Sequence, residues 1–174
     1  MRRLNMIILF VILALVFVGC SKANNPKEKA EEFLNIYYGQ YEMKDEIKEI
    51  ANQSNLGSTN SGEDLLIVCS EGQAQAIMEF IDENFKDMLT DNAKELLVSN
   101  RLIPKLDVLD SDIVKATVTS VEFDEDKEDK ENLSFNVSIE YEHEDGSTST
   151  SSAKGWIKIV EEEGKLKVDG FRFY

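Results

Sequence analysis

Apolar residues in the first half of the chain recur every three or four positions, which is the spacing of one face of an α-helix. Asn25 and Pro26 are residue types favoured at an N-cap and at the first helical position, so a helix is predicted to begin there. The apolar stripe continues to about Ala51, and Gly39 is expected to bend or weaken the helix. The stripe consists of Ala30, Phe33, Leu34, Tyr37, Tyr38, Tyr41, Ile47 and Ile50.

Two more helices are predicted before Pro104, which is expected to end the helical part of the chain. Ser70 and Gln73 form a capping box at the start of the first of them, and Thr90 or Asp91 caps the second. The buried face of the first helix is predicted to consist of Ala74, Ile77, Phe80, Ile81, Phe85, Met88 and Leu89. The second helix is short and is predicted to run through Leu96, Leu97 and Val98.

In the second half of the chain apolar residues alternate with polar ones, which is the pattern of strands with one buried face. The parity of the apolar positions switches between Val118 and Val121, which predicts a β-bulge near Thr119 and Ser120. Residues 124–131 contain six acidic residues and two lysines, and predict a solvated hairpin loop. The next strand is predicted to point inward with Leu133, Phe135, Val137, Ile139, Tyr141 and His143.

The loop after this strand sets the register of the following strand. A two-residue turn of Asp145 and Gly146 would place Val137 opposite Lys154, whereas a three-residue loop over 144–146 would place Val137 opposite Ala153. Opposed residues share a face of the sheet, and Val137 lies on the apolar face. The three-residue loop places Ala153 on this face, whereas the two-residue turn would place a charged lysine there. We therefore predict the three-residue loop, with Gly146 in the left-handed conformation.

These elements predict an α+β fold over residues 26–174, in which N-terminal helices pack on a curved antiparallel meander sheet of about four strands. The layout resembles the nuclear-transport-factor-2-like superfamily, also called cystatin-like. The resemblance rests on the helix over 33–41, the long meander, and the closing segments 155–159 (GWIKI) and 164–171 (GKLKVDGF). It implies a sheet concavity that can hold a small ligand or, in isomerases and dehydratases of the superfamily, catalytic Asp, His or Tyr side chains.

The first residues have the pattern of a secretory signal peptide. Arg2 and Arg3 precede an apolar run over 4–18, and polar residues follow this run at once. Residues 17–20 (FVGC) resemble a lipobox, at which a signal peptidase cuts before a cysteine that carries lipid, as in many small lipoproteins of Gram-positive bacteria. Phe17 departs from the usual leucine.

We therefore predict a signal peptide over 1–19 and a tether over 20–25, in which Cys20 carries a diacylglyceryl group with acyl chains such as palmitate. The predicted location is the outer face of the cell membrane. A retained transmembrane anchor is the second interpretation, although a spanning helix needs about 20 apolar residues.

The chain is strongly acidic, with 19 Lys and Arg, 34 Asp and Glu, and a formal net charge of −15. Loss of residues 1–19 would remove two arginines and bring the formal charge to −17. This charge argues against nucleic-acid binding and against adsorption to anionic lipid. The expected partners are the membrane, through the lipid anchor, and a protein, which includes another copy of the chain.

No metal or cofactor is expected. Cys69 is the one cysteine besides Cys20, so no disulfide within the chain can form once Cys20 is lipidated. It ends an apolar run over 65–69 whose pattern fits a strand or a buried helix. The acidic segment is not an EF-hand, because Asp129 stands where that loop needs glycine. Residues 53–63 are rich in Ser, Asn and Gly and predict a loop.

Four polar residues mark one end of the predicted apolar sheet face: Tyr141, His143, Ser149 and Ser151. They could line the mouth of a ligand pocket, with Tyr141 or His143 as catalytic groups. They could also be exposed residues at strand ends, which is the interpretation we favour.

Trp156 is the candidate for an interaction site. By parity it faces away from Ile157 and Ile159, and its neighbours on that outer face include Lys154 and Lys158. Tryptophan is enriched in binding hot spots, although a tryptophan lying over lysine stems would give the same pattern.

The function predicted is that of a non-catalytic binding or assembly module. The alternatives are a carrier of a small apolar ligand and an isomerase- or dehydratase-like enzyme.

Overall fold

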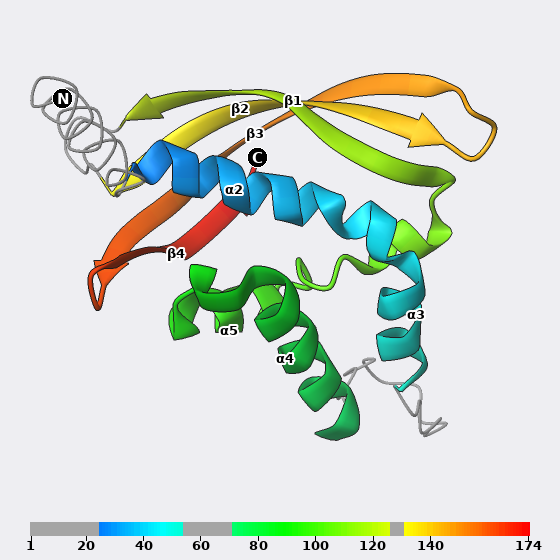
Figure 1. The fold of residues 1–174 in the computed structure, drawn as a ribbon, viewed down its shortest axis with the longest axis horizontal. Helices are drawn as coiled ribbons and strands as arrows, with labels where there is room; N and C mark the ends of the chain where they lie inside the picture. Colours follow the sequence, from blue (N-terminus) through cyan, green and yellow to red (C-terminus); the bar gives the residue numbers. More distant parts are fainter. Residues whose placement is uncertain (1–24, 54–70, 126–130) are drawn as a thin grey trace, which may run out of the picture.

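The chain has its helices first and an antiparallel sheet after them (Figure 1). The computed structural model describes residues 25–53, 71–125 and 131–174. The helical elements are α2 (Pro26–Gly39), η1 (Gln40–Met43), α3 (Lys44–Asn52), α4 (Glu71–Phe85), η2 (Lys86–Met88), α5 (Asp91–Ser99) and η3 (Leu106–Asp110), where η denotes a short 3₁₀ helix. The strands are β1 (Ile113–Glu125), β2 (Asn132–His143), β3 (Thr148–Glu162) and β4 (Lys165–Phe173). In these residues they form a four-stranded antiparallel sheet in the order β1-β2-β3-β4, so the predicted α+β fold is confirmed.

α2 begins at the predicted residue. The side chain of Asn25 accepts a hydrogen bond from the backbone N–H of Lys27 (3.0 Å), and Pro26 occupies the first turn, where its missing N–H costs nothing. The helix ends at Gly39, and η1 and α3 follow it. The predicted bend at Gly39 is therefore confirmed.

The buried side chain of Gln40 fixes this break in the helix. Its amide nitrogen donates to the carbonyl of Tyr37 (3.0 Å), and its oxygen accepts from the backbone N–H of Lys105 (2.9 Å). Both ends of the amide are satisfied, so Gln40 joins the end of α2 to the segment before η3 without leaving a buried polar group unpaired.

Some helical predictions are wrong. Ala74 is exposed, although it is predicted to lie on the buried face of its helix. α5 buries Ala93 and Leu97, which are one turn apart, whereas Leu96 is 42% exposed on another side of the helix. Pro104 does not end the helical part of the chain, because η3 follows it.

Thr90, and not Asp91, caps α5: its hydroxyl accepts a hydrogen bond from the backbone N–H of Ala93 (3.1 Å).

Several predictions concern residues outside the described part of the chain. These are Cys20 and the rest of 1–24, the capping role of Ser70, Cys69 with the other residues of 54–70, and residues 126–130 of the acidic loop.

The predicted strand register is confirmed. Val137 pairs with Ala153, and the loop over 144–146 holds Gly146 at φ 79°, in the left-handed region that glycine adopts without strain. The register of β1 against β2 shifts between Val118 and Ser120, at the predicted bulge.

α2 lies across the inner face of the sheet, α4 contacts α2 on the side away from the sheet, and α5 lies beside β4 (Figure 1). Phe33 shows how the layers meet, because its ring lies 5.8 Å from that of Phe85 in α4 and 4.8 Å from that of Phe171 in β4. Buried residues from the helices and the inner face of the sheet form a hydrophobic core around Phe33.

Candidate functional site

The polar candidates of the inner face lie at the hairpin that joins β2 to β3. Ser149 pairs with Tyr141 and Ser151 pairs with Ile139, as the predicted register requires. His143 contacts Ser149, with 2.7 Å between its Nε2 and the serine Oγ. Ser151 lies two residues further along β3 and is exposed.

Asp112 extends this contact to three side chains, and it is not among the residues predicted from the sequence. Its Oδ2 lies 3.1 Å from Nδ1 of His143, so the imidazole stands between a carboxylate and the Ser149 hydroxyl. Asp112 immediately precedes β1, where Ile113 pairs with His143. The pairing of β1 with the end of β2 would have revealed the contact, but the sequence pattern gave no register for β1.

The Asp112–His143–Ser149 array has the order of contacts found in an activated serine, in which a carboxylate orients the imidazole that accepts the hydroxyl proton. In such enzymes the carboxylate is buried, whereas the side chain of Asp112 is 71% exposed. Water competes for these hydrogen bonds at the surface. The array is therefore better suited to tie the hairpin to the start of β1 than to activate Ser149.

Tyr141 is poorly suited to act as a base. It is half-buried, and its ring packs edge-on against Tyr41, with 5.6 Å between the ring centroids. Burial, together with the nearby Tyr41 and Asp107, raises the pKa of Tyr141 to about 12. Its hydroxyl stays protonated at neutral pH and can serve only as a hydrogen-bonding group there.

Trp156 is half-buried on the outer face of the sheet and lies over Gly170, where a Cβ atom would come 3.0 Å from the indole. Lys154 is exposed. Lys158 forms ion pairs with Asp169 (3.2 Å) and Glu131 (3.7 Å). Part of the predicted interaction site is thus engaged within the domain, and its role toward a partner stays a prediction.

Asp169 anchors the start of α5 to β4. Its carboxylate accepts hydrogen bonds from Thr90 Oγ1 (2.9 Å) and Lys158 Nζ (3.2 Å), and Asn92 Nδ2 donates to its carbonyl (3.0 Å). Burial acts to raise the pKa of Asp169, but the hydrogen bonds from Thr90, Lys158 and Asn92 outweigh it and hold the pKa below its usual range.

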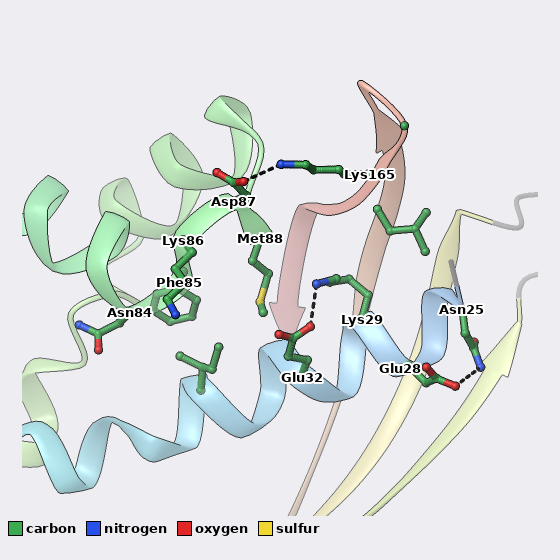
Figure 2. A pocket seen from close by; sticks show the side chains of 13 residues that line it. Asn25, Glu28, Lys29, Glu32, Asn84, Phe85, Lys86, Asp87, Met88 and Lys165 are labelled. Atoms are coloured by element: carbon green, nitrogen blue, oxygen red, sulfur yellow. Dashed lines mark hydrogen bonds and ion pairs between the residues drawn. The ribbon is translucent and has the colours of Figure 1, made fainter. Parts of the chain in front are cut away.

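A groove of about 710 Å³ lies between α2, the end of α4 with η2, and the turn from β3 to β4 (Figure 2). Ion pairs from Lys29 to Glu32 (2.6 Å) and from Lys165 to Asp87 (2.7 Å) lie at this groove. Its apolar lining consists of Ile36, Phe85, Met88 and Leu166. No local sequence pattern marks this groove, because its walls come from segments far apart in the chain.

A second groove of about 420 Å³ separates α4 from α5. Its apolar walls include Ala74, Met78 and Val98, and charged residues such as Lys94 and Glu95 also line it. Met78 is 40% exposed. Of the residues predicted as sites, none of those that the structure describes lines either groove.

The described segments offer no group of three or more His, Cys, Asp or Glu side chains that could hold a metal ion. Within those same segments, every helix is too short or too polar to cross a bilayer. No protein-family model matches the chain, and no curated protein matches it.

Proposed function

We propose that the protein is a lipid-anchored binding or assembly module on the outer face of the cell membrane, without catalytic activity. The observation that carries this proposal is the packing of the inner face of the sheet. A ligand carrier or an isomerase-like enzyme of the superfamily that the chain resembles would need free space on this face.

Side chains of α2 occupy the inner face of the sheet instead. The ring of Tyr37 lies 5.3 Å from those of Phe171 and Phe173, and Phe33 lies 4.8 Å from Phe171. Phe135 stacks parallel to Phe171 at 5.9 Å. The inward positions of β2 are almost fully buried from Leu133 to Ile139. This packing supports a role that uses the exterior of the domain.

The membrane anchor is tested by replacing Cys20 with serine, which removes the thiol that would carry the diacylglyceryl group. We expect the variant to leave the membrane fraction, or to persist as an uncut precursor of higher mass, because two acyl chains supply the binding energy that a single chain barely provides. Cell fractionation and mass spectrometry measure both outcomes.

Cys69→Ser is the matched control, since it removes the other thiol of the chain. It should stay in the membrane fraction with unchanged processing. If Cys20→Ser partitions and is processed like the unsubstituted protein, the lipid anchor is wrong.

The absence of catalysis is tested at the Asp112–His143–Ser149 array, whose order of contacts makes acyl transfer the second candidate function. We expect a fluorophosphonate probe to label the full chain no more than the Ser149→Ala variant, because the exposed carboxylate gives His143 little power to activate the hydroxyl. Probe labelling read by peptide mass spectrometry makes the comparison. An adduct on Ser149 that disappears in His143→Ala would contradict the proposal and favour a hydrolase.

A further inference from the structure

β3 is longer than the strand that covers its outer edge. β4 pairs with β3 only from Gly155 to Glu162, and one further hydrogen bond joins the N–H of Tyr174 to the carbonyl of Lys154 (2.8 Å). Residues 148–153 pair with β2 on one side. Within the described residues no strand pairs with their other side.

The hairpin geometry identifies which backbone groups face this open edge. The N–H of His143 donates to the carbonyl of Ser147 (2.9 Å). In an antiparallel pair such hydrogen-bonded residues alternate with residues that point the other way. Ser147, Ser149 and Ser151 therefore direct their backbone N–H and C=O groups toward β2. The alternate residues, Thr148, Thr150 and Ser152, direct their N–H and C=O groups away from β2. The bond from Tyr174 to Lys154, two residues further on, has the same direction and supports this assignment.

This edge lacks the features that usually block the pairing of a further strand. Residues 148–153 (TSTSSA) contain no charge and no proline, and most are exposed. The opposite edge of the sheet, β1, is interrupted by a bulge after Val118 and carries Lys115 and Glu122.

The negative charge at the hairpin indicates which kind of strand could pair with this edge. Glu140 pairs with Thr150 and Glu142 with Thr148, so both carboxylates lie on the same outer face as these threonines. Glu144 and Asp145 follow in the loop. A second copy of this chain would bring the same acidic cluster to the edge and be repelled, whereas a basic strand would be attracted.

We propose that residues 148–153 of β3 bind an extended, lysine- or arginine-bearing segment of a partner protein, which adds to the sheet as a strand in line with β4. Main-chain hydrogen bonds to Thr148, Thr150 and Ser152 supply the affinity, and Glu140 and Glu142 select basic side chains. This inference rests on the proposed binding function and names the kind of partner.

The experiment uses the full-length protein in detergent micelles and a fluorescent nine-residue peptide of alternating lysine and valine. Fluorescence anisotropy measures the affinity, and hydrogen exchange measures protection of the amides over 148–152. We expect binding that protects these amides, weakens several-fold when salt screens the charges, and is lost for a peptide with glutamate in place of lysine.

Thr150→Pro removes an edge N–H that β2 does not use, and should weaken binding about tenfold, a change of about 1.4 kcal/mol. Thr150→Val keeps the N–H and should bind the peptide like the unsubstituted protein. A peptide N-methylated at alternate amides tests the same hydrogen bonds without altering the protein, and should also fail to bind.

Equal binding by Thr150→Pro and by the methylated peptide would overturn the proposal. Sedimentation without peptide tests the other occupant: a dimer that Thr150→Pro dissociates would show that a second copy covers the edge, which also overturns it. If no binding occurs while Cys20→Ser still leaves the membrane fraction or persists as an uncut precursor, this inference fails and the proposed anchoring stands.

Discussion

Replacing Phe135 by alanine is expected to lower the free energy of unfolding by about 3–5 kcal/mol. The side chain is 4% exposed and contacts Phe171 and Phe173, with ring centroids 5.9 Å and 5.7 Å away. Alanine would leave a cavity at the centre of the layer between β2, β4 and α2. The surrounding aromatic rings are held by one another, so they can close that cavity only in part.

Ser134→Ala is the control, since Ser134 is the adjacent residue on the exposed outer face. Its free energy of unfolding should change by no more than about 0.5 kcal/mol. Urea unfolding curves of both variants measure the difference. Equal losses would mean that the inner face of β2 has been assigned to the wrong parity.

Replacing Gly155 by alanine is expected to lower the free energy of unfolding by about 3 kcal/mol or more. A Cβ atom at this position would lie 2.1 Å from the carbonyl oxygen of Arg172 and 2.7 Å from Cζ of Phe135. The phenylalanine ring can move a little, but the carbonyl belongs to the neighbouring strand. The paired backbones of β3 and β4 must therefore separate locally.

Gly39→Ala is the matched control for backbone entropy. Nothing lies within 4 Å of a Cβ there, and the backbone is already in the right-handed helical region at φ −59°. This variant should be unchanged or gain up to about 1 kcal/mol. Thermal and urea unfolding measure the stability of the two glycine variants. A Gly155→Ala variant as stable as Gly39→Ala would contradict the close approach of the strands.

The sheet was largely predictable because each of its strands carries local information. The alternation from Leu133 to His143 identifies the inner face of β2, and the glycine at position 146 restricts the loop, which in turn sets the register of β3. These signals lie within about twenty residues of one another and need no knowledge of the rest of the fold.

The parts that could not be predicted depend on how distant segments meet. Ala74 follows the helical period of α4, but it lies at the open groove between α4 and α5, which periodicity does not encode. η3 is too short to show a period. Asp112 approaches His143 only because β1 pairs with β2, and Asp169 reaches Thr90 only because α5 docks beside β4. Such contacts join residues that no local pattern relates.

The position of α2 has a consequence for the time at which the core can form. The strands pair with their neighbours in sequence, so the meander can assemble from successive hairpins. α2 comes earlier in the chain than the sheet, yet Phe33 and Tyr37 pack on Phe171 in β4. During synthesis its aromatic stripe must stay without its native neighbours until β4 has emerged from the ribosome. Completion of the native core therefore waits for the last strand.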